Sequence, residues 1–579
     1  MKNLRGRLDF RQPNRGVVLI VVLVLVVMLS LAGFGFLAAM STEYEAARLN
    51  GSLLQARQTL ASAESQLLWL ADQPHQRHEI LGGLYSNPVL FQGRPVQTLP
   101  AVGSAAGGMA GMQETGAAAV GPLQSEALVA ADDVWRFSVV SVDRPPVSPP
   151  VLRFGLSSES AKLHLGTVLR WEQTTAGSGR QALMKLPGMT EVLADSLLDW
   201  MDADDIPRPM GAESEFYRSL SLSVRPANTV PTALHELLAV RGITAQAMFG
   251  EGSAAAISAS GPGEETAQEM SMPEGAGTML STPAQELTPD LFSAGATESG
   301  MSLATGLARP LAELLTVWSA ERLVQPDGTP RVNLNQQDLG VIRSGLQGRI
   351  PESLLQYVLL TRVYGVLSAS PVGIAEQSAL EVPIPPAIAA VHSLRSLGDL
   401  VDTAVLVPST GTRPAVLVRS PLQSIQADAD QVFRQLQDAA ATDTAARIPG
   451  RISLDEASEE VLRCIPGISA EQAAGLVAQR LRLQPFERRS LLWPVRAGVL
   501  TIEQWRSVLP EITNVGDVFQ AELIVFRAVG GPLLRRKLIL DAASDKARRV
   551  YWADMTNSNL EFPLSRLLPQ ATDSSQENL

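Results

Sequence analysis

The first 75 residues carry a hydrophobic pattern that changes in character partway along. Residues 17–40, VVLIVVLVLVVMLSLAGFGFLAAM, contain no charged side chain. As a helix with a rise of about 1.5 Å per residue they would span roughly 36 Å, enough to cross a bilayer core. Further on, apolar residues recur at steps of three and four, at Leu53, Ala56, Leu60, Ala63, Leu67 and Leu70. The pattern predicts one helix over 17–73, apolar in its first half, amphipathic in its second and ended by Pro74.

The charges that flank the apolar stretch set its expected orientation. A single acid, Asp9, stands before it among five basic residues, Lys2, Arg5, Arg7, Arg11 and Arg15. Basic residues stay on the cytoplasmic side of a membrane, so residues 1–16 are expected there and the rest across the membrane. A secretory signal is the alternative, although its apolar region should be shorter and end in small residues. A plain single-span anchor is another.

Composition divides the rest of the chain into folded and low-complexity regions. Residues 74–131 are expected to hold strands and loops, with a flexible Gly/Ala-rich segment over 101–131. A head region with an acidic motif follows at 132–249. Residues 250–308 contain eight acids and no Lys or Arg, which predicts a disordered linker. A second helical region is expected at 309–515.

Several segments of the head resemble helix-hairpin-helix units. In RISLDEASEEVLRCIPGISAEQAAGLVAQR (451–480), the hairpin Ile465-Pro466-Gly467-Ile468 separates two short helices, and Ser469 is a candidate N-cap. Similar patterns occur at 162–200, at 331–367 and, in degenerate form, at 236–244. Such hairpins present backbone N–H groups to phosphate in nucleic-acid proteins. The alternative is that the hairpin is a compact way of packing two helices, and the lack of a basic cluster around Ile465–Ile468 favours this alternative.

The C-terminal region alternates polar and apolar residues in three runs, at 519–529, 534–543 and 547–555. This predicts a three-stranded antiparallel meander within 516–565, followed by a disordered tail at 566–579. The meander carries a basic cluster for which a solvated edge is favoured over a docking patch, namely Arg535, Arg536, Lys537, Arg548 and Arg549. The fold class is therefore α+β, with a long N-terminal helix, a mostly helical head and small antiparallel β-sheets.

Composition argues against catalysis and against general nucleic-acid binding. The 579 residues hold 47 Lys and Arg against 59 Asp and Glu, a net charge of −12 that would repel a polyanion. A single cysteine, Cys464, excludes an internal disulfide and cysteine-based zinc sites. Nucleophile, phosphate-loop and dinucleotide motifs do not occur in a usable context. The chain is therefore expected to be no enzyme and to bind no organic cofactor.

The N-terminal junction resembles that of a type IV pilin or pseudopilin. These precursors have a short basic leader ending in Gly, as in Arg15-Gly16-Val17, and then a long helix. The resemblance implies that a prepilin peptidase cuts between Gly16 and Val17 and that Val17 is then N-methylated. Most pilins carry Glu at the fifth mature position, which pairs with the free amine of a neighbouring subunit. This chain has Val21 there.

A second stretch resembles general secretion pathway protein K, the large minor pseudopilin of type II secretion. It reads LLDWMDADDIPRPMGAESEFY at 197–217 and continues with RPANTVPTALHELLAVRGIT from 225, while FGLSSESAKLHLGT at 154–167 resembles the strand that precedes it. That family also lacks the Glu that Val21 replaces. The match is good over roughly 1–75 and 132–250 and looser beyond 310, where the chain is extended.

The resemblance implies a non-catalytic minor pseudopilin at or near the tip of a periplasmic filament. It would help to initiate filament assembly and to export proteins through the outer membrane. Expected partners are other minor pseudopilins, the major pseudopilin, the prepilin peptidase, the inner-membrane assembly platform and secreted substrates. The protein would cross the inner membrane once, with a cytoplasmic N-terminus and a periplasmic head. The alternative is a minor pilin of a DNA-uptake or adhesion pilus, with hairpin units that contact DNA.

The acidic segment is a candidate divalent-cation site. Asp195, Asp199 and Asp202 fall at i, i+4 and i+7, and Pro207 should stop their helix by about residue 206. Acids at this negative helix end require a positive partner, either Arg208 or a hard cation. Calcium suits such oxygen ligands, and the resemblance adds weight because calcium-bound heads occur among type II secretion pseudopilins. The candidate ligands are Asp199, Asp202, Asp204, Asp205, Glu213 and Glu215.

Overall fold

A computed structural model describes most of the chain. The described residues are 15–96, 134–143, 151–220, 224–250, 309–367, 373–384, 389–409, 413–557, 560 and 562–569. Four of the predicted segments lie wholly or mainly outside them: most of the leader, the Gly/Ala-rich stretch, the acidic linker and most of the C-terminal tail.

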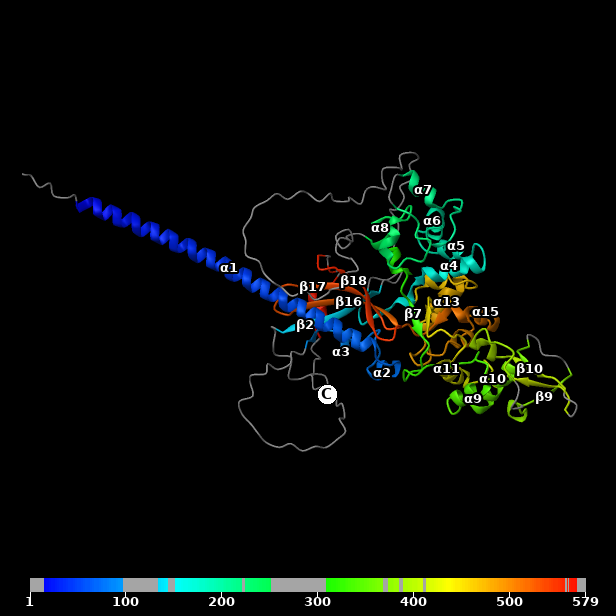
Figure 1. The fold of residues 1–579 in the computed structure, drawn as a ribbon. Coiled ribbons are helices and arrows are strands. Elements are labelled where there is room, and N and C mark those ends of the chain that lie inside the picture. Colours follow the sequence, from blue (N-terminus) through cyan, green and yellow to red (C-terminus); the bar gives the residue numbers. More distant parts are fainter. Residues whose placement is uncertain are drawn as a thin grey trace, which may run out of the picture.

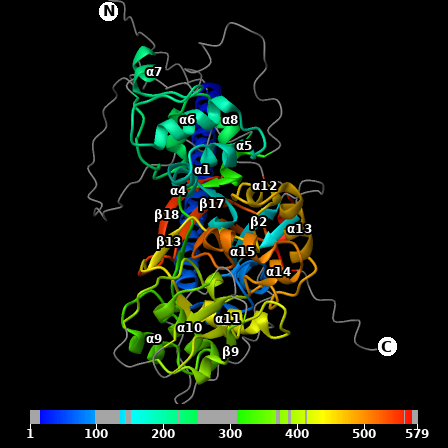
Figure 2. The ribbon, with the colours of Figure 1, turned by 90° about the vertical axis from the view of Figure 1, so that its right-hand side faces the viewer.

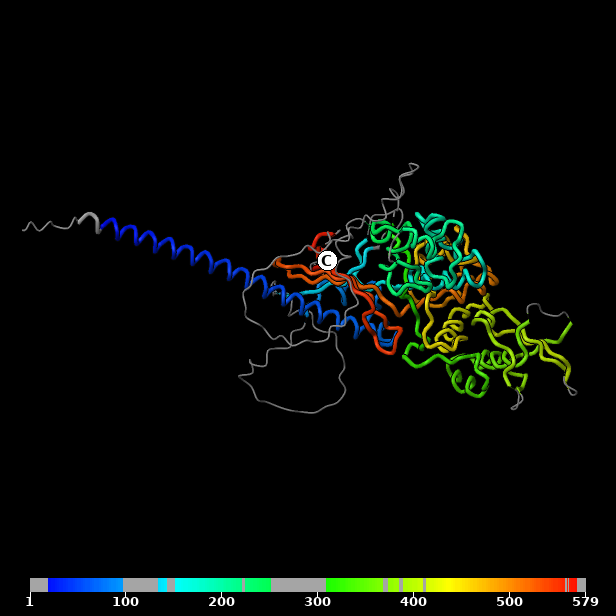
Figure 3. Tube along the Cα trace, turned by 45° about the horizontal axis from the view of Figure 1, so that its top comes forward, coloured from blue at the N-terminus to red at the C-terminus, as the bar shows by residue number. Residues whose placement is uncertain are grey.

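One helix, α1 (Arg15–Ala71), runs for 57 residues and forms the long rod in Figure 1. Its apolar side chains from Leu19 to Met40 are exposed, and Figure 3 shows this part extending away from the head. Among the described residues, α1 is long and apolar enough to cross a membrane. Five of the six residues predicted to share a buried face are buried, namely Ala56, Leu60, Ala63, Leu67 and Leu70. Leu53 remains 36% exposed.

The buried face of α1 packs on a seven-stranded sheet in which all pairings are antiparallel. Its central order is β1-β2-β16-β17-β18, with β3 beside β2 and β4 beside β16. The strands are β1 (Arg94–Pro95), β2 (Trp135–Asp143), β3 (Val151–Phe154), β4 (Ser157–Ser158), β16 (Val518–Arg527), β17 (Leu534–Asp541) and β18 (Arg548–Asp554). The predicted C-terminal meander is therefore present, and it shares its sheet with strands from the other end of the chain.

Two arginines of the sheet hold α1 by its single buried acid. Glu64 on α1 accepts from Arg549 at 2.6 Å and from Arg536 at 3.3 Å. Arg535 pairs with Glu522 at 2.6 Å, and Arg548 lies 3.5 Å from Asp541. The sequence favoured a solvated edge for this basic cluster. Strand β18 is an edge of the sheet, and Arg548 and Arg549 on it are exposed, as that interpretation requires. It is wrong for Arg535, which is buried on β17.

Three helical units are inserted between β4 and β16, and each is opened and closed by a two-residue parallel strand pair. We name them unit one (163–316), unit two (332–441) and unit three (452–513). The pairs are β5 (Leu163–His164) with β6 (Leu315–Thr316), β8 (Val332–Asn333) with β12 (Ala440–Ala441), and β14 (Ile452–Ser453) with β15 (Ile512–Thr513). An antiparallel pair, β7 (Ala320–Arg322) with β13 (Arg447–Pro449), joins the segments on either side of unit two.

The units share one hydrophobic core, and Figure 2 shows unit three between units one and two. Unit one holds α4 (Leu165–Thr174), α5 (Ser178–Met184), α6 (Glu191–Met201), α7 (Ser214–Ser219) and α8 (Ala245–Phe249). Unit two holds α9 (Leu339–Leu346), α10 (Glu352–Tyr364), α11 (Ala429–Ala439) and a sheet of β9 (Ala375–Gln377), β10 (Ala404–Val407) and β11 (Val416–Arg419). Unit three holds α12 (Glu459–Leu462), α13 (Ala470–Arg480), α14 (Trp493–Arg496) and α15 (Ile502–Val508).

The described chain is α+β, as expected, but its sheets differ from the small antiparallel ones predicted. One sheet has seven strands, and four pairings in the head are parallel. The single strand expected within 154–167 is broken into β4, a turn at Glu159–Ala161 and β5. The Ser158 side chain accepts from the Ser160 N–H and so starts this turn.

Candidate metal centre

The acidic segment begins on α6, which starts and ends with clear local signals. The Thr190 side chain accepts from the Leu193 N–H and caps its first turn. The helix ends at Met201, and Asp202 follows in an extended conformation with ψ of 172°. It therefore stops before the limit that Pro207 sets. Asp195 and Asp199 are both completely buried on α6.

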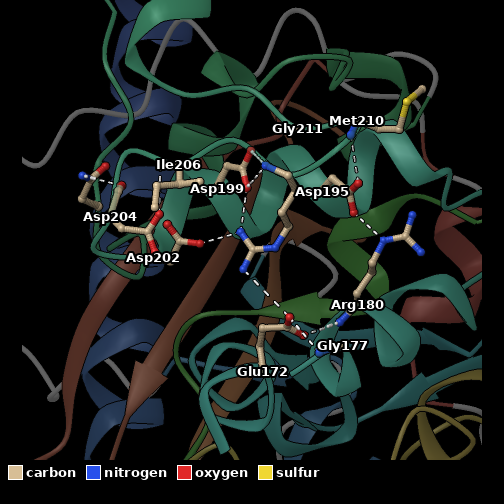
Figure 4. Close-up of polar contacts among 12 residues, drawn as sticks. Glu172, Gly177, Arg180, Asp195, Asp199, Asp202, Asp204, Ile206, Met210 and Gly211 are labelled. Atoms are coloured by element: carbon tan, nitrogen blue, oxygen red, sulfur yellow. Dashed lines mark hydrogen bonds and ion pairs between the residues drawn. The ribbon is translucent and has the colours of Figure 1, made fainter. Parts of the chain in front are cut away.

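The chain beyond α6 turns back so that Arg208 reaches two of the acids. Its Nη1 donates to Asp199 at 2.6 Å and to Asp202 at 2.5 Å, and its backbone N–H donates to Asp199 at 3.2 Å. Figure 4 shows Asp199 and Asp202 joined through this guanidinium. Arg208 is thus the positive partner named as one alternative. The close return of the chain requires Gly211, where an added Cβ would lie 1.8 Å from a carboxylate oxygen of Asp199.

Asp195 shares the helix face of Asp199 but belongs to a separate contact. Arg180 Nε donates to it at 2.5 Å, and the Met210 N–H donates at 3.2 Å (Figure 4). The three acids that the spacing placed on one face therefore contact two different arginines: Asp195 contacts Arg180, and the other two contact Arg208. Because α6 ends at Met201, Asp202 leaves the helical path and turns toward Arg208 with Asp199.

Glu213, which precedes α7, is a buried acid without a hydrogen-bond partner among the described residues. The residue is 2% exposed, and neither carboxylate oxygen has a partner there. Burial, followed by repulsion from Asp199 and Asp202, raises the pKa of Glu213 to about 7. Burial also raises the pKa of Asp199 and of Asp202, against the opposing effect of Arg208.

Asp199, Asp202 and Glu213 form a group whose geometry suits a cation. One carboxylate oxygen from each lies within 4.8 Å of the others, and all three residues are buried. One oxygen of Asp202 also lacks a partner in the described part of the chain. Three carboxylates against one arginine leave excess negative charge in a poorly solvated place, which a hard cation with oxygen ligands would offset.

The other predicted ligands lie outside this group. Asp204 is exposed and accepts from the Ile206 N–H at 2.9 Å, while exposed Asp205 accepts from the Ser214 N–H at 3.3 Å. Glu215 is exposed in the first turn of α7. The sequence reasoning missed Glu172, which lies 4.0 Å from Arg208. No local signal identifies it, because a preceding helix contributes it.

The predicted processing site lies where the described chain begins. Gly16 and Val17 are in the first turn of α1, directly after Arg15. Residues 1–14 of the expected leader lie outside the described residues. Val21 is on the exposed apolar part of α1, at 57% exposure.

One family model matches the chain. Residues 171–249 match the model described as type II secretion system (T2SS), protein K. This stretch begins inside α4, ends with α8 and contains the whole group of Asp199, Asp202 and Glu213. No curated protein and no solved structure matches the chain.

The matched region indicates a component of type II secretion. Among the described residues, α1 is the one candidate for a membrane-anchoring segment. The match confirms the resemblance to general secretion pathway protein K that the sequence at 197–217 suggested. It does not favour the pilus alternative with DNA-contacting hairpins. A component of this system implies contacts with other pseudopilins and with the secretion machinery.

Proposed function

We propose that this protein is a minor pseudopilin at or near the tip of the type II secretion filament, where it assists filament initiation and protein export. The observation that carries the proposal is the division of α1. Its first part is bare and apolar, and its last part is packed on a sheet. Such a helix can rest in the bilayer and later bury the same surface against neighbouring subunits.

The tip position rests on Val21 and on the bulk of the head. A carboxylate without a partner in the hydrocarbon region costs about 2.5–3.5 kcal/mol or more, so a subunit with nothing above it is better without one. The three helical units add mass at the end of α1 that is distant from the apolar part (Figure 1). This mass would obstruct another subunit stacked above.

The same proposal covers location and partners. The N-terminus would face the cytoplasm, α1 would cross the inner membrane once, and the head would lie in the periplasm. A prepilin peptidase would cut between Gly16 and Val17, and Val17 would be methylated. The assembly platform, the major pseudopilin and other minor pseudopilins would contact α1 and the sheet, while secreted proteins would meet the head. The role is structural and non-catalytic.

Overproduction of this protein should shorten or suppress filaments, because a subunit with Val21 does not propagate a shaft. Filament lengths would be measured by electron microscopy in cells that also make the major pseudopilin. Val21→Glu, produced at the same level, is the matched control and should suppress filaments less. Long homopolymers of the unaltered protein would contradict the tip position.

We further propose that Asp199, Asp202 and Glu213 hold a calcium ion. When bound, it would supply the positive charge that Glu213 lacks. Arg208 would then shift toward Glu172, which already lies 4.0 Å from its guanidinium. Exposed Asp204, Asp205 and Glu215 would add negative potential that attracts the ion, and carbonyl oxygens and water would complete six to eight ligands.

Excess calcium should raise the melting temperature of the full chain in detergent, and a chelator should lower it. Asp202→Asn should abolish this difference. Asp545→Asn, which alters an exposed acid between β17 and β18, should preserve it.

Without calcium, the free energy of unfolding should fall as the pH rises from about 4.5 to 7, because the pKa of Glu213 is raised to about 7 in the folded state. Calcium should therefore stabilise more at pH 8 than at pH 6. A melting temperature that calcium does not change at pH 6 or at pH 8 would contradict the calcium site. Arg208 would then be the sole positive partner of these acids.

A further inference from the structure

A cavity of about 340 Å³ lies at the seam between units one and three. One side is the end of α5 with the residues that follow it, and the other is the hairpin between α12 and α13. The apolar part of its lining comes from Met184, Leu186, Ile468 and Ala470. Its volume is at the lower end of the range for ligand sites, about 300–1,000 Å³.

Two cations face each other in this cavity. Lys185 Nζ donates to the backbone carbonyl of Arg463 at 2.7 Å, and Arg463 Nη2 donates in return to the carbonyl of Lys185. Each cation is thus held against the backbone of the other, so the two like charges are fixed close together. The hairpin geometry keeps them there, because Gly188 and Gly467 both adopt positive φ, of 73° and 88°.

Neither cation is neutralised by direct contact with an acid in the described part of the chain. Neither Lys185 nor Arg463 has an ion-pair partner there, and Glu460 on α12 pairs instead with Arg309 at 3.6 Å. Arg463 Nε is buried without an acceptor in the same part of the chain. Two adjacent cations with spare donors in an acidic protein are the arrangement that a bound anion stabilises.

We propose that the cavity at this seam binds the carboxylate of an acidic peptide segment from a partner protein. The apolar walls beside the two cations suit one acidic side chain flanked by apolar residues. A nucleic-acid backbone would require a continuous basic track, whereas the lining of this cavity holds two cations, enough for one carboxylate. The seam thus provides an interaction site independent of the acidic group on α6.

The test measures binding of two labelled peptides to the full chain in detergent by fluorescence anisotropy. One contains Leu-Glu-Leu and the other contains Leu-Gln-Leu, so they differ only in the charge of one side chain. We expect the Glu peptide to bind about tenfold more tightly, as a charge-assisted contact predicts. Lys185→Met and Arg463→Met should each weaken it by a similar factor and remove the preference for Glu. Lys185→Arg keeps the positive charge and should retain both the affinity for the Glu peptide and the preference for Glu. This variant separates loss of charge from loss of fold.

Arg482→Met is the matched control, because Arg482 is an exposed cation just after α13 and outside the cavity. It should leave the affinity for the Glu peptide unchanged. Equal affinity for both peptides, or equal loss in the Arg482 variant, would overturn the proposal. So would a thymidine oligonucleotide that displaces the peptide and binds more tightly, since the site would then recognise phosphate. Inorganic phosphate should compete only weakly.

Discussion

Replacement of Gly16 by Leu should leave the N-terminal leader attached and abolish assembly into filaments. The bond after Gly16 lies in the first turn of α1, next to a leader that carries five basic residues. A peptidase at the cytoplasmic face must reach this bond, and a side chain in place of the Gly hydrogen would obstruct it. Unaltered protein should have the mass of a chain that starts at Val17 and carries one methyl group.

Mass spectrometry of the mature N-terminus measures this directly. Gly33→Leu is the matched control, because Gly33 is on the same helix and an added Cβ there meets no atom within 4 Å. That variant should be processed normally. A Gly16→Leu protein of normal mature mass would refute the processing site, and with it the pseudopilin interpretation of α1.

Replacement of Asp517 by Ala should destabilise the head by about 3–5 kcal/mol, as expected when one partner of a buried ion pair is removed. The Asp517 side chain is 1% exposed and joins three parts of the chain at the start of β16. It lies 2.7 Å from His75 Nε2, beyond the end of α1, and accepts from the Arg322 N–H at 2.7 Å on β7. Thermal melting of the full chain measures the loss.

The effect of Asp517 should depend on pH with a defined sign. Burial opposes its ionisation, but His75 and Arg322 outweigh burial and hold the pKa of Asp517 below its usual value. The stabilisation is therefore complete above the unfolded pKa of about 3.9 and is lost as the pH falls through the folded value. The difference in unfolding free energy between the unaltered protein and Asp517→Ala should therefore be largest at pH 7 and should disappear in strong acid. Asp545→Ala, at an exposed acid, should change stability little at either pH.

Local periodicity was sufficient to predict the elements that a single stretch of sequence specifies. The buried face of α1 follows from apolar residues at steps of three and four. The three C-terminal strands follow from alternation, and each occurs close to its predicted bounds. Pairings across hundreds of residues were not predictable in this way. Leu523 of β16 lies opposite Val139 of β2, and no pattern in either strand indicates the other.

The candidate metal centre was predictable in part for the same reason. Asp199 and Asp202 are close in sequence, and the helix stop placed them together. Glu213 joins them because the chain turns back over α6, and this return depends on the close approach at Gly211. From the sequence alone, Asp204, Asp205 and Glu215 were as good candidate ligands as Asp199, Asp202 and Glu213. Only the fold separates these exposed acids from the buried one.

The parallel strand pairs that bracket each helical unit have a consequence for how such a protein can change over evolution. Paired strands lie about 4.8 Å apart, so each unit leaves the rest of the chain almost where it entered. Residues can therefore be inserted or deleted within a unit while α1 and its sheet keep their positions, whereas loss of a whole unit would expose the core that the three units share. The size of the head can then vary between descendants without a matching change in the membrane helix.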